Sequence, residues 1–167
     1  QQIKVRKDKL EALRVAEVNL YPNDFKPENP LGDLHAHKGK EEEALAQVGV
    51  KAAGRIMLLR NFGKLTFAQL RDDSGEMQIA VQRDEVGADL YKSVFRKIEV
   101  GDLIGVEGTL FLTKTGELTI RVKRFQLLAK CLRPLPEKFH GLEDVETRFR
   151  QRYVDLLIDP DSRALFK

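Results

Sequence analysis

The chain has 167 residues, of which 42% are hydrophobic and 33% are charged, and its formal net charge is +3. This composition excludes a disordered chain, and the length allows one compact domain with flanking segments but hardly two full domains. No apolar run is long enough to span a membrane, and the basic start lacks the apolar segment of a signal peptide. Because a single cysteine, Cys131, excludes an internal disulfide, we expect a cytoplasmic protein.

The first 49 residues predict an extension of helix and loop ahead of the main domain. Residues 1–13 are typical of a short charged helix with a sparse apolar side. Residues 21–33 are rich in Pro, Asn and Asp, which indicates a loop, and residues 38–47 can form a short acidic helix. The charges of that helix are typical of a solvated face, so we assign residues 1–49 to an extension.

From residue 50 to residue 130 the sequence reads as short strands separated by turn residues. The expected elements are strands at 52–60, 65–71 and 76–83, a helix at 88–97, and strands at 103–112 and 117–128. This order predicts a mainly β fold, a five-stranded OB-fold Greek-key barrel with a helix between its third and fourth strands. A ferredoxin-like domain would need a second helix and a different order of elements.

The last segment changes character again. Residues 132–143 form a Pro-containing connector, and residues 144–157 have the apolar spacing of a helix. The Asp-Pro pair at 159–160 ends that helix, and Asp161 or Ser162 is the expected N-cap of another. Because barely one turn of this last helix is present, we expect the chain to be a piece of a longer protein.

Strand alternation sorts the barrel side chains onto two faces. The side chains expected to point inward are Ile56, Leu58, Ala68, Leu70, Met77, Ile79, Val81, Leu118, Ile120 and Val122. The side chains expected to point outward are Arg55, Leu65, Phe67, Gln69, Arg71, Gln78, Ala80, Gln82, Glu117, Thr119, Arg121 and Lys123.

The outward set of the second and third strands places Phe67 among glutamines and basic residues. OB folds bind nucleic acid on this surface and on adjoining loops. An aromatic ring there can stack on an unpaired base, and a neighbouring amide can read the base edge with both a donor and an acceptor. Packing of Phe67 under the N-terminal segment is an equally weighted alternative from the pattern alone.

Residues of the types used in catalysis and metal binding do not occur at recognisable spacings. His35 and His37 lie two apart in a loop, but no cysteine or second histidine pair accompanies them, so we expect no metal site. We also expect no catalytic residue in this chain.

Four stretches carry a resemblance to a known family. Residues 54–84, GRIMLLRNFGKLTFAQLRDDSGEMQIAVQRD, resemble the first three barrel strands of the class II synthetases for lysine, aspartate and asparagine. The connector RPLPEKFHGL and the helix RFRQRYVDLL, together with YPNDF at 21–25, resemble bacterial-type lysyl-tRNA synthetases specifically. Aspartyl enzymes have a different connector before a related helix.

The resemblance implies that the barrel binds the anticodon loop of lysine tRNA. It implies that Phe67 stacks on the central uridine and that Gln78 hydrogen-bonds that base. It further implies that Glu117 contacts a neighbouring anticodon base. An arginine near the end of the first strand assists in this family, and Arg60 and Arg55 are the candidates here.

For the whole protein, the resemblance implies a homodimeric enzyme that attaches lysine to its tRNA with ATP and Mg²⁺. Residues 131–167 would be a linker and the start of a truncated catalytic domain. The chain as given then binds no cofactor and is inactive alone. Two alternatives remain open: a free-standing single-stranded nucleic-acid-binding OB protein, and the anticodon domain of an aspartyl-tRNA synthetase.

Overall fold

The computed structural model describes residues 1–136 and 144–166. It divides into two compact units, Gln1–Leu132 and Arg133–Lys167, and each is described by itself. Among the described residues, the helices are all too short or too polar to cross a membrane.

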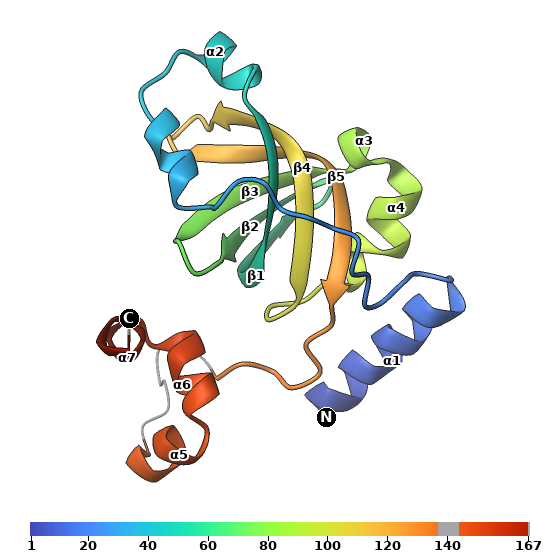
Figure 1. Cartoon of the computed structure of the whole chain (residues 1–167). Coiled ribbons are helices and arrows are strands. Elements are labelled where there is room, and N and C mark those ends of the chain that lie inside the picture. Colours follow the sequence, from blue (N-terminus) through green and yellow to red (C-terminus); the bar gives the residue numbers. More distant parts are fainter. Residues whose placement is uncertain (137–143, 167) are drawn as a thin grey trace. The chain divides into compact units, whose positions relative to one another are not determined.

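The first unit is built around a closed five-stranded barrel with the strand order β1-β2-β3-β5-β4 (Figure 1). The strands are β1 (Gly49–Phe62), β2 (Leu65–Arg71), β3 (Glu76–Gln82), β4 (Leu103–Leu112) and β5 (Leu118–Ala129). Only the β3–β5 pair is parallel among these neighbours, and that pair closes the barrel. The predicted mainly β, five-stranded OB-fold barrel is confirmed.

Helical segments surround the barrel. The N-terminal ones are α1 (Gln2–Val15), the 3-10 helix η1 (Asp33–His37) and α2 (Glu42–Ala46). Between β3 and β4 lie α3 (Arg83–Val86), α4 (Ala88–Ser93) and the 3-10 helix η2 (Phe95–Lys97). The single helix predicted at 88–97 is therefore divided, because α4 ends at Ser93 and a separate 3-10 helix begins at Phe95. Figure 1 shows α3 and α4 along one side of the barrel and α2 at the end opposite α1.

A β-bulge in β1 corrects one face assignment. Ile56 pairs with Leu70 and Leu58 pairs with Gln69, which leaves Met57 as an extra residue. An extra residue reverses the alternation of every side chain after it. Ile56 is therefore buried as predicted, but Leu58 is 41% exposed and the inward position passes to Leu59.

The barrel interior is filled by branched aliphatic side chains, as the alternation predicts. The fully buried examples are Ile56, Leu70, Ile79, Val81, Ile104, Val106, Ile120 and Val122. Aromatic side chains of α4 and η2 extend this core, because the rings of Tyr91 and Phe95 stack at 5.5 Å and Phe95 meets Phe125 edge-on at 5.2 Å. The hydroxyl of Tyr91 is hydrogen-bonded to Thr66 at 2.7 Å, so its polar atom is satisfied inside the core.

A buried ionic cluster lies where β4 begins and β5 ends. Asp102 is fully buried, and its carboxylate accepts hydrogen bonds from Lys130 Nζ at 2.7 Å and from the backbone N–H groups of Glu99 and Cys131 at 2.8 Å. The side chain of Lys130 is also fully buried and donates to Glu99 at 3.0 Å. Both charges are therefore paired and hydrogen-bonded, which is the condition for stable burial.

Helix α1 binds to this cluster. Lys9 donates to the Glu99 carboxylate at 2.8 Å, and Arg6 Nη1 donates to the carbonyl oxygens of Val100 and Cys131 at 3.0 and 2.7 Å. Leu10 and Leu13 are buried on the same helix. Of the sparse apolar side predicted for residues 1–13, Leu10 and Leu13 thus form a docking face, whereas Ile3 is 44% exposed. Arg6 and Lys9 add polar contacts that the pattern did not predict.

The second unit has three short helices, α5 (Val145–Arg150), α6 (Arg152–Ile158) and α7 (Pro160–Leu165). The helix predicted at 144–157 is interrupted at Gln151, whose φ of −116° and ψ of 50° are not helical. Much of the predicted connector, residues 137–143, lies outside the described part of the chain.

The N-cap of α7 is Asp159, so the predicted caps Asp161 and Ser162 are wrong. The Asp159 carboxylate accepts from the N–H of Asp161 at 3.1 Å and from the hydroxyl of Ser162 at 2.8 Å, and Pro160 occupies the first turn. Proline is favoured there because its missing N–H is not needed in the first turn. Arg148 ties the helices of this unit together through Asp159 at 3.0 Å.

We predict that Asp102→Ala lowers the free energy of unfolding by about 3–5 kcal/mol, because it removes the closer of the two carboxylates that pair with the buried Lys130 ammonium and the acceptor of two backbone N–H groups. Urea unfolding followed by circular dichroism measures the change. The control is Glu107→Ala, whose partner Arg124 is 3.9 Å away and 81% exposed. This control should cost at most about 1 kcal/mol. Equal losses in the two variants would contradict the importance of the buried cluster.

We predict that Glu99 contributes to stability at neutral pH and that this contribution disappears in acid. Burial alone would raise the pKa of Glu99, but hydrogen bonds and charge from Lys9 and Lys130 outweigh it, so the pKa lies below its ordinary 4.5. A carboxyl with a lowered pKa stabilises the fold above its unfolded pKa and loses that contribution as pH falls through the folded pKa. Urea unfolding from pH 7 to pH 3 should show a shallower acid loss for Glu99→Gln than for wild type. Glu43→Gln, at an exposed acid of α2, should follow the wild type.

Candidate nucleic-acid interface

The outer face of the barrel carries two rows of side chains that cross all five strands, each defined by successive partner residues. The glutamine row consists of Leu58, Gln69, Gln78, Thr119 and Phe111. The phenylalanine row consists of Arg60, Phe67, Ala80, Arg121 and Thr109. Because directly opposed residues have Cβ atoms only about 4.5–5.5 Å apart, each row is a continuous strip.

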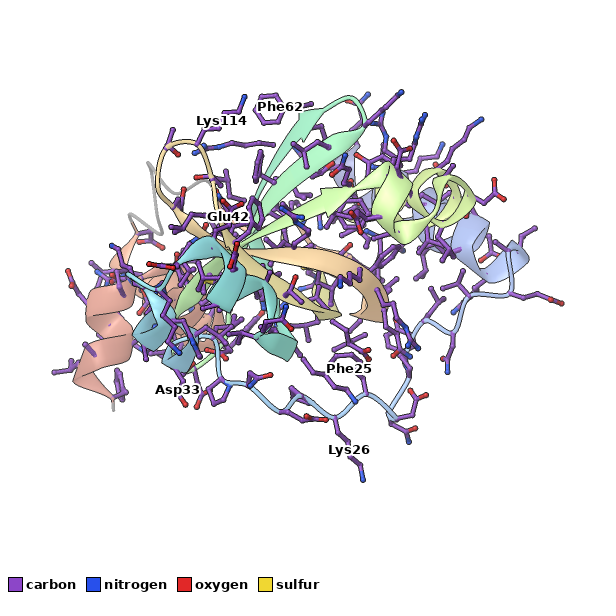
Figure 2. All side chains as sticks on the ribbon, turned by 90° about the horizontal axis from the view of Figure 1, so that it is seen from above. Phe25, Lys26, Asp33, Glu42, Phe62 and Lys114 are labelled. Atoms are coloured by element: carbon purple, nitrogen blue, oxygen red, sulfur yellow. The ribbon has the colours of Figure 1, made fainter. Side chains whose placement is uncertain are left out.

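Phe67 lies in the phenylalanine row with its side chain half-buried and outside the buried core. Its ring meets Phe62 edge-on, with centroids 6.1 Å apart and planes at 75°. Phe62 is 62% exposed, and Figure 2 shows it at the outer margin of the molecule. The pair offers aromatic surface to an unstacked base. The sequence analysis did not predict Phe62 as part of this surface, because β1 extends two residues beyond the predicted strand. The signal in the sequence was an aromatic residue directly before the turn at Gly63.

The β-bulge decides which arginine joins this surface. Arg60 is exposed and is the direct cross-strand partner of Phe67, so the two residues adjoin on the outer face. Arg55 pairs with Arg71 at the other end of β2, about 13 Å along the strand from Phe67. The Arg55 guanidinium donates to the carbonyl of Gly101 at 2.6 Å. The structure therefore brings Arg60 to the rows and keeps Arg55 apart from them.

Gln78 and Thr119 form a hydrogen-bonded pair across the parallel seam. Gln78 Nε2 donates to Thr119 Oγ1 at 2.9 Å, and Thr119 Oγ1 donates to the carbonyl of Glu117 at 3.1 Å. Thr119 belongs to the outer face as predicted, but it is fully buried there. The reason is its place between strands, where Gln78 and Phe111 are its direct partners on either side.

Glu117 lies at the base of the β4–β5 hairpin, with its side chain exposed. Its backbone exchanges hydrogen bonds with Thr113, from Thr113 N–H to Glu117 O and from Glu117 N–H to the Thr113 hydroxyl, both at 3.0 Å. Gly116 takes a φ of 78°, which this tight turn requires and which glycine adopts without strain. The hairpin thus holds Glu117 beside the glutamine row, two residues from Thr119 along the chain.

Basic side chains of β5 continue the surface. Arg121 stacks over the ring of Phe111, with its guanidinium carbon 4.8 Å from the ring centroid, and is exposed. Lys123 is exposed on the same strand. Both can approach the phosphates of a bound strand, because basic residues beside an aromatic surface are the usual arrangement for single-stranded nucleic acid.

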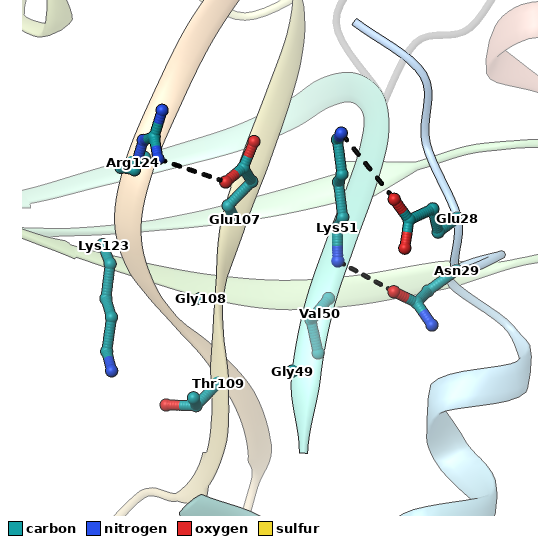
Figure 3. Close-up of a pocket in the computed structure, with 10 residues that line it drawn as sticks. All are labelled: Glu28, Asn29, Gly49, Val50, Lys51, Glu107, Gly108, Thr109, Lys123 and Arg124. Carbon is teal, nitrogen blue, oxygen red and sulfur yellow. Dashed lines mark hydrogen bonds and ion pairs between the residues drawn. The ribbon is translucent and has the colours of Figure 1, made fainter. Parts of the chain in front are cut away.

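A cavity of about 400 Å³ lies where β1, β4 and β5 adjoin the segment that contains Glu28 and Asn29 (Figure 3). Two of its cations are paired with acids: Lys51 with Glu28 at 3.7 Å and Arg124 with Glu107 at 3.9 Å. Lys123 extends away from both pairs in Figure 3. Charge in this cavity is therefore largely balanced, and the outer rows are the stronger candidate for an anionic partner.

The two histidines of the 3-10 helix η1 have hydrogen-bond partners within the fold. His35 Nε2 is 2.7 Å from the carbonyl oxygen of Glu76, and His37 Nδ1 is 3.0 Å from Lys40. Within residues 1–136 and 144–166, no three His, Cys, Asp or Glu side chains gather closely enough to hold a metal ion.

Comparison with known proteins shows which family the chain resembles. Residues 50–128 match the model of the OB-fold nucleic acid binding domain. A Lysine--tRNA ligase of Magnetococcus marinus is 64% identical over 169 residues, which cover 100% of this chain and 34% of that protein. Lysine--tRNA ligases of Pasteurella multocida and Cupriavidus metallidurans are 52% and 47% identical over 165 residues, covering 97% of this chain.

The chain belongs to the lysine–tRNA ligase family. It matches the N-terminal region of these ligases and spans about a third of the length of the relatives it matches. The barrel is the OB-fold, tRNA anticodon-binding domain of this family.

We predict that Phe67→Ala weakens binding of a single-stranded RNA loop by about 1–3 kcal/mol, since each base stacked on an aromatic ring contributes this much. Fluorescence anisotropy with a labelled stem-loop measures the affinity, and urea unfolding measures stability. The matched control is Phe95→Ala, which removes a buried ring and should instead cost about 3–5 kcal/mol of stability. A Phe67→Ala variant with lost stability and unchanged affinity would place that ring in the core.

Proposed function

We propose that the domain binds the anticodon loop of lysine tRNA and selects uridine at its central position. The observation that carries the proposal is the pairing, on one outer face, of the half-buried Phe67 ring with the anchored amide of Gln78. Phe67 supplies stacking, and Gln78 supplies recognition of the base edge. Arg60 and Glu117 flank them at the two ends of this surface.

Uridine and cytidine differ in the groups that an amide can read. Uridine offers an N3–H donor beside carbonyl acceptors, whereas cytidine offers an N3 acceptor beside an amino donor. Gln78 binds uridine when its Oε1 accepts from N3–H and its second Nε2 proton donates to a carbonyl. Cytidine in the same position sets an acceptor against an acceptor, and leaving polar groups unpaired in this way costs about 1–3 kcal/mol.

Glu117 and Arg60 have complementary roles in this proposal. The Glu117 carboxylate accepts hydrogen bonds only, so it favours a neighbouring anticodon base that presents a donor. Arg60 stands beside Phe67, where its guanidinium can bind the phosphate of the stacked nucleotide or cover the base itself. Arg55, which is hydrogen-bonded to Gly101, is left with a structural role.

The whole protein is proposed to be a homodimeric cytoplasmic lysine–tRNA ligase that uses ATP and Mg²⁺. Support comes from relatives named Lysine--tRNA ligase, of which this chain spans about a third. Residues 1–49 are then the extension, residues 50–130 the anticodon-binding domain, and residues 131–167 a linker with the start of the catalytic domain. ATP and Mg²⁺ are assigned to the remainder of the ligase, and the 167-residue chain alone is expected to be inactive.

We predict that wild-type protein binds an anticodon stem-loop with central uridine more tightly than one with central cytidine, and that Gln78→Ala removes most of this difference. Residual binding should persist, because Phe67 still stacks. Anisotropy titration of both loops gives the two affinities. Gln69→Ala is the matched control, since Gln69 is the neighbouring glutamine of the same row and carries no assigned contact to the base.

Two further variants sharpen this experiment. Glu117→Ala should relax selection at an adjacent position and leave the central preference intact. Equal affinity of wild type for both loops, or for an unstructured poly-dT strand, would instead favour a general single-stranded nucleic-acid-binding protein. An aspartyl-type domain is disfavoured, because the relatives carry the lysine name.

A further inference from the structure

We infer that Thr119 is a positioning residue that fixes the orientation of the Gln78 amide and thereby sets the preference for uridine over cytidine. The inference rests on the proposed function of Gln78. Thr119 does not itself need to touch RNA, because it is fully buried beneath the outer face. Its effect would pass through the single hydrogen bond that joins it to Gln78.

The direction of this hydrogen bond follows from a count of protons. A threonine hydroxyl has one proton, and that of Thr119 is donated to the backbone carbonyl of Glu117 at 3.1 Å. With its proton given to that carbonyl, Thr119 Oγ1 accepts from its other partner. Gln78 accordingly presents its NH₂ group to Thr119, at 2.9 Å, and turns its Oε1 away.

The opposite amide orientation retains one hydrogen bond fewer. With Gln78 Oε1 facing Thr119, the Thr119 hydroxyl would have to turn from the Glu117 carbonyl to Oε1, and its hydrogen bond to Glu117 would be lost. Water cannot replace that bond at the hydroxyl, because Thr119 has no exposed surface. The loss of one hydrogen bond biases the amide about two- to twelvefold toward the observed orientation.

This bias matches the chemistry of one base. No hydrogen bond to Gln78 Oε1 occurs among the residues that the structure describes, so this acceptor is available to a ligand. Uridine presents an N3–H to it, whereas cytidine would need the amide reversed. Gln69, the directly opposed neighbour of Gln78, lacks such an anchor within the described residues, which makes Gln78 the stronger reader of the two.

Thr119→Val tests the inference, because valine keeps the branched shape of threonine and removes both the acceptor and the donor. The Gln78 amide is then free to rotate and can satisfy either base. In the full 167-residue chain, the ratio of affinities for uridine-centred and cytidine-centred stem-loops should fall by about twofold or more. The cytidine loop should bind more tightly than it does to wild type, which a purely structural defect would not produce.

Thr119→Ser is the matched control, because it keeps the hydroxyl and should keep the wild-type ratio. An unchanged ratio in Thr119→Val, or equal weakening of both loops, would overturn the role of Thr119. Absence of any uridine preference in wild type would instead refute the proposed function of Gln78, so the two failures are distinguishable.

If Thr119→Val does not fold, a measurement on the wild-type protein still tests whether the Gln78 amide is anchored. In the proton–nitrogen NMR spectrum, one Nε2 proton of Gln78 should exchange slowly with solvent, with Gln78→Ala providing the assignment. Rapid exchange of both Gln78 side-chain protons would refute the anchored amide.

Discussion

The β-bulge at Met57 is the local constraint on which the candidate interface depends. It lets Ile56 face the core and, four residues later, lets Arg60 face outward beside Phe67. Without the extra residue, strict alternation would turn Arg60 inward, where a charge without a partner is costly. The same irregularity exposes Leu58 in the glutamine row, so the outer face gains both a cation and an apolar side chain from one backbone feature.

The candidate interface also depends on closure of the barrel, which brings together segments that are distant in the sequence. The parallel pairing of β3 with β5 places Thr119 opposite Gln78, 41 residues away in the chain. An amide anchored by a buried hydroxyl loses less freedom on binding than an amide that is free to rotate, so it discriminates better between donors and acceptors.

Stability and the proposed recognition rest on different parts of the first unit. The buried Asp102–Lys130 pair and the cations of α1 hold together the start of β4 and the end of β5, whereas Phe67 and Gln78 lie on β2 and β3. Among the described residues, no hydrogen bond or ion pair joins the ionic cluster to Phe67 or Gln78. We therefore expect substitutions in the rows to leave the fold intact, because sites without shared partners contribute additively.

The sequence by itself determined the strand order, the OB barrel and the placement of Phe67 and Gln78 on one face, because alternation and turn residues are local signals. Only the tertiary structure decided that Leu58 is exposed, that Arg60 and not Arg55 adjoins Phe67, and that Thr119 is buried against Gln78. The tertiary structure also decided where the helix after Asp144 is interrupted and which residue caps α7. The physical reason is that bulges, cross-strand partners and caps depend on residues brought together by folding, which a periodic pattern along one strand does not encode.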